Sequence, residues 1–198
     1  MELVVTAFVS LDGVAQAPGH PDEDTDGGFR NGGWSIPFFD PDAMGTFIGD
    51  GMATTTALLF GRRTWQGMAR AWPERAGDPY ADRMNAVDKH VASRTLAQED
   101  LTWSNSHLLP ADDVLGAVRR LREQDGGDLR VWGSTQLVHA LVGADLVDRY
   151  ELMVEPVLLG GGKRLLPDDG VVRPLQLVEA RTAATGVQIC TYRPVRAG

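Results

Sequence analysis

The sequence has little of what several protein classes require. Its single cysteine, Cys190, excludes an internal disulfide and is expected to fill space in the core. Lys and Arg number 19 against 27 for Asp and Glu, which gives a net charge of -8. This balance disfavours general nucleic-acid binding, because contact with the phosphate backbone needs an excess of positive charge. A local basic pocket for a small anion remains compatible with it.

Long apolar runs and targeting signals are also missing. No apolar stretch is long enough to span a bilayer, and no basic segment followed by an apolar run begins the chain. We therefore expect a cytoplasmic protein with neither a membrane nor a nucleic acid as its partner. Hydrophobic residues make up 43% and charged residues 23% of 198 residues, which is ordinary for a folded protein. A single domain over residues 1–198 is expected.

Signals for a metal site or a nucleophilic serine are absent too. The histidines are scattered without the spacing of metal ligands. They are His20, His90, His107 and His139. No serine lies in a nucleophile-elbow motif. The run Gly160-Gly161-Gly162-Lys163 lacks both the spacing of a phosphate-binding loop and a following helix, so it is interpreted as a turn between strands.

The order of predicted elements points to an α/β fold. Strands are expected at 2–10, 57–60, 90–93, 101–109 and 129–133, and helices at 40–54, 64–69, 111–124 and 134–142. The polar stretch 73–88 is given no element. Three further strands, 150–159, 174–183 and 187–194, end the chain. Alternating elements followed by a β-rich tail predict a mixed, mostly parallel sheet flanked by helices, with antiparallel C-terminal strands.

A long Gly- and Asp-rich segment, 11–36, separates the first strand from the first helix. Compact domains rarely keep such a loop without a use, so the acidic part from Asp22 to Gly33 is interpreted as a mobile flap over a site. Plain disorder is the alternative.

The turn Gly61-Arg62-Arg63-Thr64, between a buried strand and a helix, is the most informative motif. Free N–H groups and the positive end of the helix dipole face an incoming anion at such a helix start. The two guanidinium groups can add charge-assisted bonds to a phosphate. A solvated basic turn is the alternative interpretation.

Two other strand ends resemble it. Gly133-Ser134-Thr135-Gln136 also opens a helix, and Ser93-Arg94 follows the strand between them. The carboxyl ends of strands are where α/β sheets bind their ligands. Two phosphate-binding helix starts and a third basic strand end suit a dinucleotide that carries an extra phosphate.

Four motifs, in this order, resemble the dihydrofolate reductase superfamily, and more closely its riboflavin-biosynthesis reductase branch, the RibD C-terminal domain. They are Val9-Ser10-Leu11-Asp12-Gly13, Leu58-Leu59-Phe60-Gly61-Arg62-Arg63-Thr64-Trp65, Val131-Trp132-Gly133-Ser134-Thr135-Gln136-Leu137, and Leu146-Val147-Asp148 with Glu155-Pro156-Val157-Leu158-Leu159-Gly160-Gly161-Gly162-Lys163. The resemblance covers nearly the whole chain. It implies a dihydrofolate-reductase-like fold and, as the branch commonly forms, a homodimer.

The resemblance also implies NADPH as the cofactor. Arg62, Ser93 and Arg94 would hold its 2′-phosphate, although Arg94 could be a surface charge. The pyrophosphate would lie against Arg63, Thr64, Ser134, Thr135 and Gln136, between the turn glycines Gly61 and Gly133. Leu137 would pack nearby, unless it is simply a core position. Ala7 and Gly13 would border the nicotinamide.

For the substrate, the resemblance implies hydride transfer to a small heterocycle, similar to 5-amino-6-(5-phosphoribosylamino)uracil reductase. Arg30, Lys163 and Arg164 could bind a substrate phosphate. Asp40 is the candidate proton donor, with Asp42 and Asp50 as others. Asp before Pro at a helix start is equally an N-cap. Two further functions stay open, a pterin or folate reductase and a non-catalytic dinucleotide-binding module.

Overall fold

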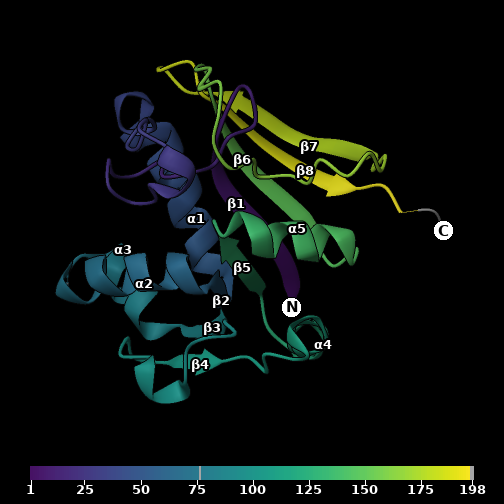
Figure 1. The fold of residues 1–198 in the computed structure, drawn as a ribbon. Coiled ribbons are helices and arrows are strands. Elements are labelled where there is room, and N and C mark those ends of the chain that lie inside the picture. Colours follow the sequence, from purple (N-terminus) through teal and green to yellow (C-terminus); the bar gives the residue numbers. More distant parts are fainter. Residues whose placement is uncertain (76, 197–198) are drawn as a thin grey trace.

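The computed structural model describes residues 1–75 and 77–196, and one eight-stranded sheet runs through them (Figure 1). The strand order is β4-β3-β2-β5-β1-β6-β8-β7. The strands are β1 Glu2–Ser10, β2 Thr55–Gly61, β3 Asp88–Ala92, β4 Ser106–Leu108, β5 Asp128–Trp132, β6 Arg149–Glu155, β7 Leu175–Thr182 and β8 Gln188–Pro194. All pairs from β4 to β6 are parallel, whereas β8 pairs antiparallel with β6 and β7. The predicted fold class is confirmed.

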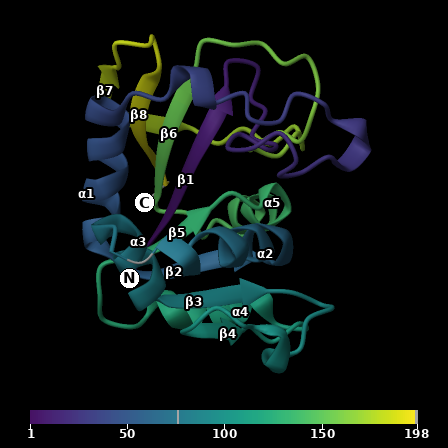
Figure 2. The ribbon, with the colours of Figure 1, turned by 90° about the vertical axis from the view of Figure 1, so that its left-hand side faces the viewer.

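Helices cover both faces of the sheet because the strands present apolar side chains to each face. The α-helices are α1 Thr46–Thr54, α2 Arg62–Ala71, α3 Pro79–Ala86, α4 Val114–Arg122 and α5 Thr135–Gly143. Leu3, Val5 and Ala7 of β1 belong to the core cluster that α4 and α5 complete. Met153 of β6 belongs to the opposite cluster, with residues of α1, α2 and α3. Figure 2 shows α1 along one side of the sheet and α5 on the other. Within the described residues, no helix is long and apolar enough to cross a membrane.

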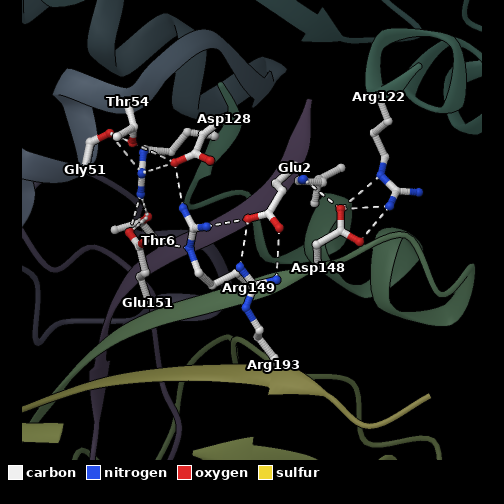
Figure 3. A network of polar contacts seen from close by, with 12 residues as sticks. Glu2, Thr6, Gly51, Thr54, Arg122, Asp128, Asp148, Arg149, Glu151 and Arg193 are labelled. Carbon is white, nitrogen blue, oxygen red and sulfur yellow. Dashed lines mark hydrogen bonds and ion pairs between the residues drawn. The ribbon is translucent and has the colours of Figure 1, made fainter. Parts of the chain in front are cut away.

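A buried charge network closes the amino ends of the central strands (Figure 3). The Arg130 side chain is 1% exposed and donates to Asp128 at 3.0 Å, to Glu151, and to the Gly51 carbonyl at 2.9 Å. Arg149 also bonds to Asp128, at 2.6 Å. Buried charges are tolerated only when paired and hydrogen-bonded in this way. The network joins β1, β5, β6 and α1, and it leaves the carboxyl ends of the strands free for a site.

Gly51 explains why a glycine lies inside helix α1. A Cβ at this position would come within 3.0 Å of the Arg130 guanidinium. Glycine at this position therefore leaves room for the buried arginine.

The strand expected at 150–159 ends at Glu155, and three other regions also differ from the expectation. The helix expected at 40–54 begins as a π-helix, Pro41–Gly45, and continues as α1. The polar stretch 73–88 contains α3, whose start is capped by Asp78 just as Asp40 caps the π-helix. The strand expected at 101–109 is only β4, because Asn105 adopts a left-handed turn with φ of 57°.

Candidate cofactor and substrate site at the carboxyl ends of the strands

The predicted anion-binding turns after β2 and β5 contact each other directly. The Gly61 N–H donates to the Ser134 hydroxyl at 2.8 Å, and that hydroxyl donates to the Thr64 hydroxyl at 2.7 Å. A Cβ on Gly61 would lie 2.7 Å from the Ser134 Oγ, so only glycine allows this approach. Gly133 and Ser134 both have positive φ, 62° and 61°. A serine held in this conformation is strained, and such strain is typical of functional turns.

Both helices that start here present free N–H groups. Within the described residues, neither N-cap residue, Gly61 of α2 or Ser134 of α5, makes a side-chain capping bond. Thr135 and Gln136 form the first residues of α5. First-turn N–H groups without a side-chain acceptor, together with the helix dipole, favour a bound anion. The arrangement can therefore hold a pyrophosphate between the two helices.

Arg62, Ser93 and Arg94 follow neighbouring strand ends, because Gly61 pairs with Ala92 in the sheet. Arg62 donates to the Gln66 side chain at 3.3 Å, and Arg94 is exposed. The Ser93 hydroxyl accepts the N–H groups of Thr95 and Leu96 at 3.1 and 3.0 Å. Two guanidinium groups and a hydroxyl thus border one edge of the site.

The residues predicted to line the rest of the cofactor occupy different settings. Ala7 lies in the central strand β1, paired with Leu152, and is 4% exposed. Gly13 has φ of 86°, and its carbonyl accepts the Leu165 N–H at 3.0 Å. Leu137 belongs to the core cluster, in agreement with the core alternative.

Arg63 contacts the acidic segment expected to be a flap. Its guanidinium forms an ion pair with Asp26 and lies 3.8 Å from Asp24. Lys163 binds the same two carboxylates, at 3.0 and 2.5 Å. The segment after β1 is therefore tied both to the start of α2 and to the glycine-rich turn, and its carboxylates occupy the place expected for a phosphate.

A cavity of about 690 Å³ opens beside this contact. Arg30 and Lys163 line it, together with Phe29 and the run Gly160–Gly162. Arg164, the third residue expected to bind a substrate phosphate, instead donates to the Asp12 carbonyl at 2.9 Å. No helix follows the glycine run, in agreement with its interpretation as a turn.

Asp12 orders that glycine-rich turn. Its carboxylate accepts the N–H groups of Leu159 and Gly160 at 3.1 and 2.8 Å, and the Ser10 hydroxyl at 2.6 Å. The hydroxyl bond, followed by the two N–H bonds, lowers the pKa of Asp12 to about 2. Asp12 therefore fixes the glycine-rich turn to the end of β1.

Asp40 caps the π-helix. One carboxylate oxygen accepts the N–H groups of Asp42 and Ala43 at 3.0 and 2.9 Å, and the other accepts that of Ala184 at 2.9 Å. These bonds, with that from Ala43 first, lower the pKa of Asp40. A carboxylate held charged in this way is a poor proton donor, so the geometry favours the capping alternative. Its catalytic role stays a prediction.

A different carboxyl, Glu155 at the end of β6, belongs to the fourth sequence motif but is not among the proton donors expected from the sequence. It is 0% exposed, and the Ser35 hydroxyl donates to its Oε1 at 2.6 Å. Its Oε2 has no hydrogen-bond partner among the described residues. Burial raises the pKa of Glu155 to about 7. The available signal was an acidic residue at an inward position of an apolar strand, two residues after Met153.

The chain is similar to several known proteins in sequence or in fold. Over 168 residues, 82% of this chain and 85% of the relative, the sequence is 28% identical to the uncharacterized protein YyaP of Bacillus subtilis (strain 168). A protein from Shewanella sp. PV-4, assigned provisionally to riboflavin biosynthesis, has a similar structure with a TM-score of 0.76 and 18% identity, over 99% of this chain and 100% of that one.

Dihydrofolate reductase from Enterococcus faecalis, complexed with NADP(H), matches with a TM-score of 0.60 and 14% identity, over 98% of this chain and 97% of that one. A diaminohydroxyphosphoribosylaminopyrimidine deaminase/5-amino-6-(5-phosphoribosylamino)uracil reductase from Thermotoga maritima matches with a TM-score of 0.64 and 14% identity, over 98% of this chain and 56% of that one. These likenesses confirm a dihydrofolate-reductase-like fold. The sequence profile of the RibD C-terminal domain matches residues 2–189, and the chain belongs to that family.

Proposed function

We propose that this protein is an NADPH-dependent reductase of a small heterocyclic substrate. The observation that carries the proposal is the contact between Gly61, Thr64 and Ser134, which brings two uncapped helix starts together beside Arg62. Such a pair of helix starts suits the two phosphates of a dinucleotide. When bound, the reduced nicotinamide would supply a hydride.

The residues present fit this cofactor. Arg62, Ser93 and Arg94 would bind the 2′-phosphate, which distinguishes NADPH from NADH. Thr64, Ser134, Thr135 and Gln136 would hold the pyrophosphate, and Arg63 would join them once Asp26 releases it. Ala7 and Gly13 would border the nicotinamide at the end of β1. In this arrangement the protein orients the reactants and excludes water.

The substrate class follows from the family and from two structural neighbours. One neighbour is named as a uracil reductase and the other as a dihydrofolate reductase complexed with NADP(H). A C=N or C=O bond of a small heterocyclic substrate is therefore the proposed acceptor. The cavity lined by Arg30 and Lys163 would take a phosphate carried by that substrate. We also propose a cytoplasmic homodimer that pairs through the C-terminal strands.

A turnover assay tests the proposal. The purified protein is mixed with NADPH and 5-amino-6-(5-phosphoribosylamino)uracil, and the loss of NADPH absorbance is followed. Oxidation that depends on the pyrimidine supports the reductase, with the double variant Arg62→Ala/Ser134→Ala as the control expected to be inactive. Binding of NADPH without oxidation by this pyrimidine, or by dihydrofolate in a parallel assay, would favour the non-catalytic module.

A further inference from the structure

Glu155 is the last residue of β6, and its position places it beside the end of the central strand. It pairs with Ser10 of β1, just before the turn that contains Gly13. Because side chains alternate along a strand, Glu155 shares a face with Met153 and Glu151, the face covered by α1. The carboxyl thus lies at the same edge of the sheet as the candidate cofactor site.

The bonding of this carboxyl has no structural explanation. Ser35 satisfies Oε1, while Oε2 is buried and unpartnered among residues 1–75 and 77–196. No salt bridge joins Glu155 to a cation in this part of the chain, in contrast to Glu151 on the same strand. An unsatisfied buried polar atom is destabilising, so each one calls for a reason. A leucine would fill the same space without this loss.

Other unpartnered polar atoms lie on the same face. Buried side-chain atoms without a hydrogen-bond partner are, besides Glu155 Oε2, Trp132 Nε1 and Arg181 Nε, within the described residues. Trp132 packs against Phe8 with ring centroids 6.1 Å apart, and the Arg181 guanidinium lies over Phe47 of α1, 5.3 Å from its centroid. Polar atoms spaced among aromatic rings are characteristic of a site for a flat polar ligand.

The segment that covers Glu155 belongs to the long loop after β1. Ser35 follows Trp34, which donates from its Nε1 to the Gln16 carbonyl at 2.7 Å. Among the described residues, the Ser35 hydroxyl makes the only hydrogen bond between this loop and the Glu155 carboxyl. Movement of this part of the loop would uncover the carboxyl from the side of the candidate flap.

We propose that Glu155 is the acid of this site, which holds a proton on Oε2 and delivers it to the nitrogen of a C=N bond in a flat heterocyclic substrate bound between α1 and the sheet. This inference rests on the reductase function proposed above, and it names the residue that completes the reaction. Because the Ser35 hydroxyl donates to Oε1, that oxygen is the carbonyl of a neutral acid. The proton therefore resides on the unpartnered Oε2.

Proton transfer from Glu155 would accompany the hydride transfer. When the carbon of a C=N bond gains a hydride from the reduced nicotinamide, the π electron pair of that bond moves to nitrogen. The nitrogen takes the proton from Oε2, so an N–H bond forms and the O–H bond breaks. Glu155 is left as a carboxylate and regains a proton from water when the site opens.

The surroundings of Glu155 favour the neutral form. Charged groups on neighbouring elements include Asp12 after β1 and Asp40 before α1, which bind backbone N–H groups, and Arg181 of β7, which lies over Phe47. Among the described residues none of the three bonds to Glu155. On β8 the facing residue, in register beyond Val154 and Gln188, is the apolar Val187. With burial opposed only by the Ser35 bond, the pKa of the acid is raised to about 7, so the carboxyl is mostly protonated below that pH.

Infrared spectroscopy tests the protonation directly and without any ligand. At about pH 5.5 the wild-type protein should show a protonated-carboxyl band that Glu155→Gln lacks and that fades by about pH 8.5. Glu179→Gln, which removes an exposed carboxyl of β7, should keep the band. Ser35→Ala should shift its loss to higher pH. A spectrum of Glu155→Gln identical to that of wild type would overturn the proposal.

Ligand binding tests the contact, with 2,4-diaminopyrimidine as the probe and tryptophan fluorescence as the signal. Glu155→Gln should bind the probe at least about tenfold more weakly than wild type, while Glu179→Gln and the NADPH affinity of all variants stay unchanged. Equal binding of the probe by wild type and Glu155→Gln, or no binding by wild type, would refute the role of Glu155 alone. Failure of wild type to bind NADPH would instead refute the proposed function, whatever the infrared result.

Discussion

At the scale of single residues, the two arginines of the basic turn have different partners. Among the described residues, the Arg62 side chain bonds only to Gln66 on its own helix, whereas Arg63 is paired with Asp26 of the loop after β1. Arg62 is therefore available for a phosphate without displacing any other charge. This difference makes the selectivity for the 2′-phosphate a property of one side chain that can be tested by itself.

Arg62→Ala is expected to weaken NADPH binding by about 10- to 150-fold and to leave NADH binding nearly unchanged, because a charge-assisted hydrogen bond contributes about 1.5–3 kcal/mol. The measurement is a fluorescence titration with each cofactor. Arg70→Ala, in the last turn of the same helix, is the matched control and should bind both as wild type does. Equal losses for the two cofactors in Arg62→Ala would contradict the assignment.

Glu155 should also make the stability of the protein depend on pH. Burial raises its pKa from the ordinary value of 4.5 to about 7, so the folded state holds a proton that the unfolded state has lost. The free energy of unfolding should then fall by up to about 3 kcal/mol as the pH rises from 4.5 through 7. Urea denaturation of wild type and Glu155→Gln across this range measures the difference, which should vanish if Glu155 is already ionised when folded.

At the scale of elements, the loop after β1 is ordered by charge contacts with the site that it borders. Asp24 and Asp26 bind Lys163 and Arg63, and the Gln16 side chain donates to the carbonyls of both aspartates at 3.0 Å. These contacts favour the flap interpretation over plain disorder. They also place two carboxylates where a phosphate would bind.

Asp26→Asn is therefore expected to tighten NADPH binding by a factor of up to about five, because it removes a competing and repelling charge at a partly exposed ion pair. The gain should shrink at high salt. Asp22→Asn, in the same loop but without an ion pair among the described residues, serves as the control. Weaker NADPH binding by Asp26→Asn would mean that the carboxylate supports the cofactor site rather than competing for it.

The sequence predicts part of these elements well, for physical reasons that differ between sites. The turns after β2 and β5 are predictable from local motifs, because their glycines and helix-start residues lie within a few positions of one another in the sequence. Helix α3 is not predicted from the sequence, because it lies in a polar stretch in which the Asp78 cap is one of several polar residues. The bonding of the Glu155 carboxyl is not predictable from the sequence, because it depends on a contact with Ser35, 120 residues away.

At the scale of the whole molecule, the polar network at the amino ends of the strands holds the sheet and α1 in one arrangement. The site lies at the opposite ends of the same strands, so its geometry depends on how β1, β5 and β6 are fixed. Arg130 makes the largest set of bonds in this network, to Asp128, Glu151, Thr6, Thr55 and Gly51.

Arg130→Met should lower the free energy of unfolding by about 3–5 kcal/mol, because it leaves buried carboxylates with fewer partners. Chemical denaturation measures the loss. The triple variant Arg130→Met/Glu151→Met/Asp128→Asn removes the stranded charges and should recover part of the stability. A small effect of the single change would show that Arg149 alone compensates for the carboxylates of Asp128 and Glu151.

The measurement that tests the account most directly is a paired titration of the wild-type protein with NADPH and NADH, followed by tryptophan quenching. Trp65 of α2 and Trp132 of β5 both lie on elements that end or begin at the candidate site. We expect saturable binding of NADPH and binding of NADH that is at least about tenfold weaker. Equal affinities would contradict the assignment of the 2′-phosphate pocket, and binding of neither cofactor would contradict the proposed function itself.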